Sequence, residues 1–155
     1  MLLDFEFYAA KGNAFVRLVA DELDAPRARS GRVIRSVLHA LRNRLTHEAS
    51  FHLLAQLPIV LKGLYVDGWD YYRENPPISD LSDFLTEVMK EDDDLAAYDF
   101  GDYENEMAAV ASVFRVLCCF ISEKEMHHVL QLLPLPLTAF VKDSIRYQET
   151  ATLAI

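Results

Sequence analysis

The chain has 155 residues, of which 52% are hydrophobic and 25% are charged, and its formal net charge is −9 at pH 7. This length suits a single domain with a substantial core, and the hydrophobic share excludes a disordered chain. Five glycines and six prolines are too few for an all-β protein with many tight turns, and the excess of acids argues against bulk nucleic-acid binding, which needs a basic surface.

The beginning of the chain lacks the basic segment of a signal peptide, and it carries Asp4 and Glu6 where such a peptide would be apolar. No uncharged apolar run reaches the roughly 18 residues that mark a membrane-spanning helix. Cys118 and Cys119 are adjacent, so they cannot join distant segments, and we expect both to be buried as small hydrophobic side chains. The sequence therefore predicts a cytoplasmic protein with no membrane partner.

Hydrophobic residues recur at helical spacing through the first half of the chain. The clearest stripe, in residues 31–45, is formed by Ile34, Val37, Leu38, Leu41 and Leu45. An earlier helical stripe, within residues 15–23, ends at Asp24-Ala25-Pro26, where proline stops a helix.

Thr46 is placed to cap the next helix. The inner face expected for that helix is formed by Phe51, Leu54 and Leu57. Pro58 should open a further helix that runs to about residue 65, because proline fits the first position of a helix and not its interior. Residues 68–77 contain Pro76-Pro77 and are expected to form a connection.

The same pattern returns after 76 residues, where Leu133-Pro134 repeats Leu57-Pro58 and an apolar stripe again precedes it. Ser122 and Glu125 form a capping box, which marks the start of a helix. The first helix repeats at a shift of 69, which leaves a seven-residue insertion between Glu91 and Glu106. The eight identities between residues 33–65 and 109–141 are Ser36/Ser112, Val37/Val113, Leu41/Leu117, His52/His128, Leu54/Leu130, Leu57/Leu133, Pro58/Pro134 and Leu61/Leu137.

We therefore predict an all-α protein in which two tandem, similar helical repeats pack into one bundle-like domain spanning residues 1–155. Repeat one covers about residues 5–66, the connection about 67–78, and repeat two about 79–149. The acidic insertion at about 91–106 is expected to be a solvated linker that its aromatic residues pin to the body.

Several runs of residues resemble a known family. They are VLHALRNRLT at 37–46, LAQLP at 54–58 and GLYVDGW at 63–69, followed in the second half by the run from Ile121 to Pro134. In these runs the chain is similar to domain-of-unknown-function family 2267 of bacteria, and the similarity extends from about Phe5 to Val141. The resemblance implies two helical repeats and no activity, catalytic residue or cofactor. Leu132, which replaces the Gln56 of repeat one, and the extra Pro136 depart from the pattern at the last helix.

Basic residues are unevenly distributed. The segment between Asp24 and Glu48 contains no acid but six arginines. Residues 1–66 carry 9 Lys and Arg against 6 Asp and Glu, for a net charge of +3, whereas residues 67–155 carry 6 against 18, for a net charge of −12.

Four of these arginines are candidates for binding an anion or a protein partner: Arg32, Arg35, Arg42 and Arg44. Three of them lie with His39 on the helix face opposite the apolar stripe, and their counterparts in repeat two are Ala108, Ala111 and Cys118. Pairing with the acidic insertion, within one chain or across a dimer, is one interpretation, and an anion or an acidic partner is another. Nucleic acid is disfavoured because the charge of −12 opposes its approach.

Trp69, Tyr71 and Tyr72 follow Gly68 in the connection between the repeats. We expect them to form an inter-repeat aromatic cluster that wedges the two units together, and a partner-binding surface is the alternative.

The sequence predicts no catalytic residue, no metal site and no cofactor, since it lacks a nucleophile elbow, a phosphate loop and metal-ligand spacing. His52 and His128 hold matching repeat positions, which favours a shared structural role. We predict a non-catalytic interaction or regulatory module, with a second copy or an acidic protein as partner. The alternative is a small-ligand-binding protein with an apolar or anion-accepting groove between the repeats, lined by residues such as Phe51, Leu54, Trp69 and Phe114.

Overall fold

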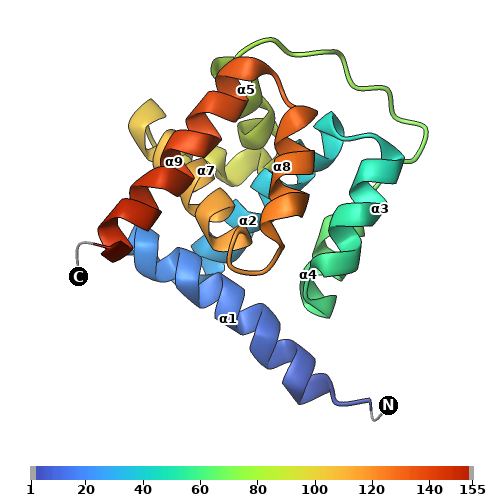
Figure 1. The fold of residues 1–155 in the computed structure, drawn as a ribbon, viewed down its shortest axis with the longest axis vertical. Coiled ribbons are helices and arrows are strands. Elements are labelled where there is room, and N and C mark those ends of the chain that lie inside the picture. Colours follow the sequence, from blue (N-terminus) through green and yellow to red (C-terminus); the bar gives the residue numbers. More distant parts are fainter. Residues whose placement is uncertain (1–2, 154–155) are drawn as a thin grey trace.

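A computed structural model describes residues 3–153, and each regular element within them is helical (Figure 1). The first half contains α1 (Phe5–Leu23), α2 (Arg27–Arg44), α3 (His47–Gln56) and α4 (Ile59–Val66). The second half contains α5 (Leu81–Glu91), the 3-10 turn η1 (Asp93–Leu95), α6 (Ala96–Phe100), α7 (Tyr103–Leu117), α8 (Glu123–Gln131) and α9 (Leu135–Leu153). The predicted all-α class is confirmed. Within residues 3–153, no helix combines the length and the hydropathy that crossing a membrane requires.

The helix ends follow from local side-chain chemistry. Five N-cap side chains accept a hydrogen bond from a backbone N–H three residues later, and they are Asp4, Thr46, Asp80, Asp102 and Ser122. Each cap of this kind contributes about 1 kcal/mol. The predicted caps at Thr46 and Ser122 are thus confirmed.

The prolines also lie where a helix tolerates them. Pro58 is the N-cap of α4. Pro136 lies in the first turn of α9, where a backbone N–H has no partner within the helix, so the helix continues past it. The departure from the family pattern at Pro136 therefore leaves the last helix intact.

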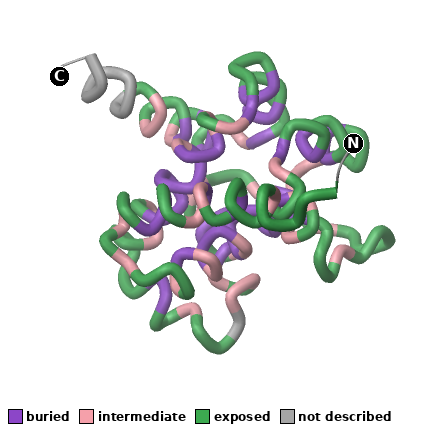
Figure 2. Tube along the Cα trace, turned by 90° about the horizontal axis from the view of Figure 1, so that it is seen from below, coloured by how far each residue is buried: buried purple, intermediate pink, exposed green. Residues whose placement is uncertain are grey.

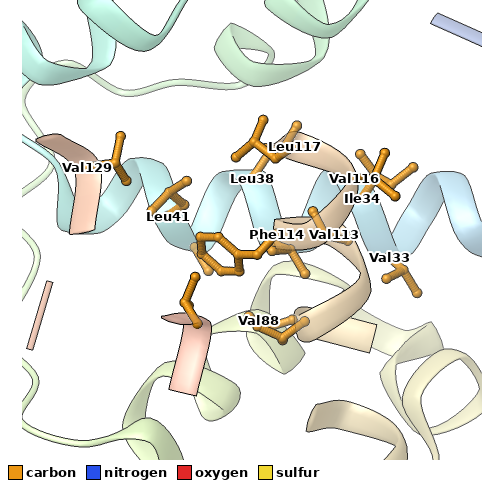
Figure 3. Close-up of a cluster of buried hydrophobic side chains, with 14 of the residues drawn as sticks. Val33, Ile34, Leu38, Leu41, Val88, Val113, Phe114, Val116, Leu117 and Val129 are labelled. Atoms are coloured by element: carbon orange, nitrogen blue, oxygen red, sulfur yellow. The ribbon is translucent and has the colours of Figure 1, made fainter. Parts of the chain in front are cut away.

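The core forms around α2, which packs against α1, α4, α5, α6 and α7. All residues from Ser36 to Arg42 are buried, so α2 is covered on its polar face as well as on its apolar stripe. Figure 2 shows the buried positions gathered in the interior of the trace. In Figure 3, Leu38 and Leu41 of α2 lie beside Phe114 of α7. Leu38 and Leu41 are fully buried, and Phe114 is 1% exposed.

Two expectations about individual residues were wrong, and one about a segment was right only in part. Phe51 is 62% exposed, because α3 buries a stripe that includes Ser50 and Leu53 instead. Cys118 is half-buried and Cys119 is exposed, since α7 ends just before them and the chain turns outward. The acidic insertion is largely exposed and is pinned to the body by Phe100, as expected, but it folds into η1 and α6 instead of forming an irregular linker.

The helices of the second half begin 76 residues after those of the first: Arg27 and Tyr103, His47 and Glu123, and Ile59 and Leu135. Packing between the halves is reciprocal, since α1 contacts α7 while α5 contacts α2. The equivalent helices α3 and α8 meet each other, and there the rings of His52 and His128 stack with centroids 6.2 Å apart. We propose that the two halves arose by internal duplication. The constant spacing of 76 residues between these helix starts supports the proposal.

Candidate functional site

The arginine face of α2, formed by Arg32, Arg35, Arg42 and Arg44, is directed at segments of the same chain. Arg32 binds Asp99 through two hydrogen bonds, from Nε to Oδ2 at 2.7 Å and from a terminal nitrogen to Oδ1 at 2.8 Å. Arg29 adds a hydrogen bond of 2.7 Å from its Nε to the backbone oxygen of Asp99. A bidentate pair of this kind fixes both position and orientation. It anchors α6, and with it the acidic insertion, to α2.

The Asp99 side chain is fully buried, whereas that of Arg32 is 33% exposed. Burial by itself opposes ionisation of the carboxyl, but the hydrogen bonds from Arg32 and the charges of Arg32 and Arg29 outweigh it, so the pKa of Asp99 is held below its usual range. At neutral pH this site is therefore a satisfied ion pair rather than a vacant anion receptor.

Arg42 and His39 together cap the C-terminal end of α4. Arg42 is 5% exposed, and one terminal nitrogen donates to the backbone oxygens of Tyr65 at 2.7 Å and Asp67 at 3.0 Å. The Nε2 of His39 lies 2.7 Å from the backbone oxygen of Leu64. The last carbonyls of a helix have no partner within it, and they carry the negative end of its dipole. These two basic side chains of α2 supply the missing donors.

Burial lowers the pKa of both side chains, against the opposing effects of the hydrogen bond to Leu64 for His39 and of the Glu91 charge for Arg42. His39 is 1% exposed, and its Nδ1 lies 3.9 Å from Oε2 of Glu91. Asn43 donates to the other oxygen of Glu91 at 3.0 Å, so this carboxylate joins α5 to the same face of α2.

Arg44 joins the connection to α5. Its two terminal nitrogens bind the backbone oxygen of Pro76 and Oε1 of Glu87, both at 2.7 Å. The Arg44 and Glu87 side chains are 7% and 18% exposed. Burial raises the pKa of Glu87, although the charge of Arg44 counters it.

Arg35 differs from the other three. Its side chain is 40% exposed, and a terminal nitrogen lies 3.4 Å from Oδ2 of Asp67, whose side chain is 65% exposed. An exposed pair at this distance contributes little to stability. Arg35 and Arg32 line a hollow of about 420 Å³, but Glu91, Asp92 and Asp94 line it as well. Pairing with the acidic insertion, within one chain or across a dimer, was one interpretation of the arginine face, and of its four arginines the structure shows such a pair within one chain for Arg32. Arg42 and Arg44 also bind acceptors of the same chain, but these acceptors lie outside the insertion.

The aromatic residues of the connection form a shelf with α3, which we call the aromatic shelf (His47, Phe51, Trp69, Tyr71 and Tyr72). The rings of His47 and Tyr71 stack with centroids 4.3 Å apart, and Tyr72 packs edge-on against Tyr71 at 5.2 Å. Trp69 contacts His47 at 5.6 Å and Phe51 at 6.3 Å.

Trp69 is held by contacts with two buried side chains. The ring of Tyr65 meets it edge-on with centroids 5.9 Å apart, and the Arg42 guanidinium lies 5.7 Å from its ring centroid. Tyr65 in turn lies 2.7 Å from the hydroxyl of Ser50, and its burial raises its pKa to about 12. The ring contacts that the structure gives for Trp69 and Tyr71 join residues of the first half or the connection, so the shelf does not show the inter-repeat wedge that we expected.

The residues proposed to line a groove between the repeats do not share one. Phe114 is 1% exposed and lies in the core, whereas Phe51 is 62% exposed on the shelf. Within the part of the chain that the structure describes, no group of three or more His, Cys, Asp or Glu residues could hold a metal ion.

A comparison with protein families places the chain in one of them. The sequence model of the family described as "Uncharacterized conserved protein (DUF2267)" matches residues 12–140. The chain belongs to this family. No curated protein matches it. The family description names no activity, so functional inference depends on the arrangement of the residues.

Sequence reasoning identified the arginines but not their partners. Asp99, Glu87 and Glu91 lie among several acids of similar spacing, and no local pattern distinguishes them. One feature of the sequence could have indicated Asp99, since this residue directly precedes the aromatic Phe100. In the structure Phe100 is completely buried. A carboxylate next to a buried anchor on a short helix is itself placed near the core.

Proposed function

We propose that this protein is a non-catalytic interaction module that binds a protein partner through the aromatic shelf. The observation that carries the proposal is the exposure of the shelf: Tyr72 is 87% exposed, Phe51 62% and Tyr71 61%. Exposed aromatic clusters mark interaction sites, because tyrosine and phenylalanine bury a large area on binding and have few rotamers to lose.

The support beneath the shelf strengthens this proposal. Trp69 is fixed by Tyr65 and Arg42, and Arg42 is held by backbone oxygens of the first half. The outer rings therefore stand on a preorganised base, which lowers the entropy lost when a partner binds.

Charge indicates the kind of partner. Glu48, Asp67 and Asp70 lie next to or between the shelf residues in the sequence, and residues 67–155 carry a net charge of −12. A basic partner would be steered toward such a surface. The acidic partner that the arginine face predicts would meet chiefly Arg35, because the other three guanidiniums bind acceptors of the same chain.

The small-ligand alternative has less support. The hollow beside Arg32 and Arg35 is the closest approach to an anion-accepting groove, yet three acids line it. These carboxylates would repel an anion at neutral pH.

The test uses the full chain, immobilised and exposed to an extract of the source cells, with bound proteins identified by mass spectrometry. The partner is then purified and titrated by calorimetry. We expect the double substitution Tyr71→Ser and Tyr72→Ser to weaken binding about 30-fold or more, which is the loss typical of central aromatic residues.

The matched control is Tyr98→Ser, because Tyr98 is 70% exposed but lies on α6, away from the shelf. It should bind the partner as the wild type does. Failure to bind any protein, or equal affinity for the double variant and the wild type, would rule out the shelf as the binding site.

A further inference from the structure

The buried stripe of α1 continues beyond the body of the protein. Gly12, Phe15 and Val19 are buried, and the same stripe continues toward the N-terminus through Tyr8 and Phe5 at spacings of four and three. Tyr8 is half-buried and Phe5 is 74% exposed. Figure 1 shows why, since the first turns of α1 extend past the other helices, and Figure 2 shows these turns as exposed. Among the residues that the structure describes, the end of this stripe at Phe5 is left largely exposed.

Other apolar side chains lie around this end of the stripe. Gly12 approaches α4 so closely that an added Cβ would lie 2.8 Å from Cβ of Val60, which places α4 directly against α1. Phe7, Ile59 and Val60 are 52%, 48% and 46% exposed. We call this surface the N-terminal patch (Phe5, Phe7, Tyr8, Ile59 and Val60).

A hollow lies within the patch. Its volume is about 350 Å³, and its lining includes Tyr8, Leu57, Pro58 and Phe120. The patch therefore presents a projecting aromatic side chain, Phe5, and a mainly apolar hollow that can accept one. A surface that carries both a projecting side chain and a hollow of matching size can bind a copy of itself. In a two-fold arrangement the projecting side chain of each copy fills the hollow of the other.

The size of the patch agrees with what a dimer needs. Taking about 200 Å² for a whole aromatic side chain, the exposed fractions of the patch amount to on the order of 400 Å² of apolar surface. A standard interface buries about 800 Å² per partner, of which roughly 55–65% is apolar. The patch thus supplies most of the apolar area of a stable homodimer.

Charge favours a second copy at this surface. The chain carries a formal net charge of −9, so two copies repel each other over most of their surfaces. Residues 4–14 and 59–66 are an exception, because Asp4 and Glu6 are balanced by Lys11 and Lys62. Asp4 at the beginning of α1 and Lys11 two turns later lie on the same face of the helix, so the pair is self-complementary when two such helices run antiparallel.

We infer that the N-terminal patch binds the N-terminal patch of a second copy in a two-fold dimer with antiparallel α1 helices. Phe5 of each chain enters the hollow beside Tyr8 of the other, and Lys11 lies near Asp4 of the partner. This inference does not depend on the aromatic shelf, which is built from α3 and the connection.

Sedimentation equilibrium of the full chain tests the inference. The wild type should have twice the chain mass at micromolar concentrations, and Phe5→Ser together with Ile59→Ser should weaken association about 30-fold or more. Both side chains are exposed, so the fold should remain, which circular dichroism and a urea titration check. Tyr72→Ser is the matched control, since it removes a more exposed aromatic residue from the shelf and should leave the dimer unchanged.

Charge reversal gives a sharper result. Lys11→Glu and Asp4→Lys should each weaken self-association several-fold, because each places like charges opposite each other. An equimolar mixture of the two variants should recover the dimer, because both ion pairs form again with reversed polarity. A wild type that stays monomeric up to about 200 μM, or a dimer that is insensitive to Phe5→Ser with Ile59→Ser, would overturn the inference. Restoration by mixing would establish the antiparallel pairing.

Discussion

The helices α2 and α7 begin 76 residues apart and correspond in the proposed duplication, but they contact their surroundings differently. On α2, Arg32, His39 and Arg42 bind α6 and the end of α4. The equivalent positions of α7 carry Ala108, Arg115 and Cys118, and Arg115 binds Glu22 of α1 at 3.0 Å. The same apolar stripe can therefore support two kinds of polar face, one that organises neighbouring segments and one that packs with few polar contacts.

This difference extends to the helices that follow. The eight-residue α4 ends where His39 and Arg42 bind its last carbonyls, whereas the equivalent α9 begins at Leu135 and continues for 19 residues. The side chains of α2 bind the carbonyls that further turns of α4 would otherwise bind. The helix can therefore stop, and the connection begins at residue 67.

The largest expected effect tests what the two helices share. Leu41→Ala in α2 and Leu117→Ala in α7 change fully buried leucines at equivalent positions. Each should lower the free energy of unfolding by about 3 kcal/mol, because each leaves a cavity in the same core. Urea denaturation measures both. A difference of more than about 2 kcal/mol between the two variants would show that the two stripes are not equivalent.

The next largest effect tests the polar contacts in which α2 differs from α7. Arg42→Ala leaves the backbone oxygens of Tyr65 and Asp67 without their donor, so we expect a loss of about 2–3 kcal/mol in the free energy of unfolding. Cys118→Ala, at the equivalent position of α7, should cost less than about 1 kcal/mol. Arg35→Ala is the control on α2 itself, with a loss within about 0.5 kcal/mol, because its ion pair is exposed. Equal losses for Arg42→Ala and Arg35→Ala would refute the capping role.

Asp99→Asn should destabilise the protein by about 2 kcal/mol at pH 7, because it removes the charge that Arg32 binds. The folded-state pKa of Asp99 is lowered, so its contribution to stability is present above the unfolded value of about 3.9 and is lost as pH falls below it. The difference in unfolding free energy between wild type and variant should therefore shrink between about pH 4 and pH 2. A difference that stays constant over this range would count against an ionised Asp99.

The smallest effect concerns His39. Burial lowers its pKa, so the stability of the folded state is complete above the unfolded value of about 6.5 and declines as pH falls through and below that value. His39→Gln should flatten this decline by up to about 1.4 kcal/mol per pH unit, and urea denaturation from pH 7 to pH 5 measures it. The ring faces the backbone oxygen of Leu64 and the charges of Arg42, Arg35 and Glu91, so an NMR titration of His39 should give a value below 6.5. An unshifted pKa for His39 would contradict its burial as a neutral side chain.

Local patterns sufficed for several helix boundaries, chiefly in the first half and at the start of α8. Thr46 and Ser122 cap helices because a side-chain oxygen within three residues of a free N–H needs no tertiary context. The inner face of α3 was misplaced at Phe51, because a ten-residue helix with several apolar residues allows more than one stripe. Which stripe is buried depends on the neighbours, here Tyr65, whose hydroxyl lies 2.7 Å from that of Ser50.

By itself, the sequence determined the all-α class, the capped helix starts and the concentration of arginines on one helix, because these depend on interactions over a few residues. Only the tertiary structure decided what the arginines bind. Arg32 and Asp99 are 67 residues apart in the chain, and Arg42 and Tyr65 are 23 apart. Their pairing depends on how α6 and α4 lie against α2, which no local spacing encodes. Burial turned most of a basic stripe into a set of internal contacts, and it left the aromatic shelf and the first turns of α1 exposed.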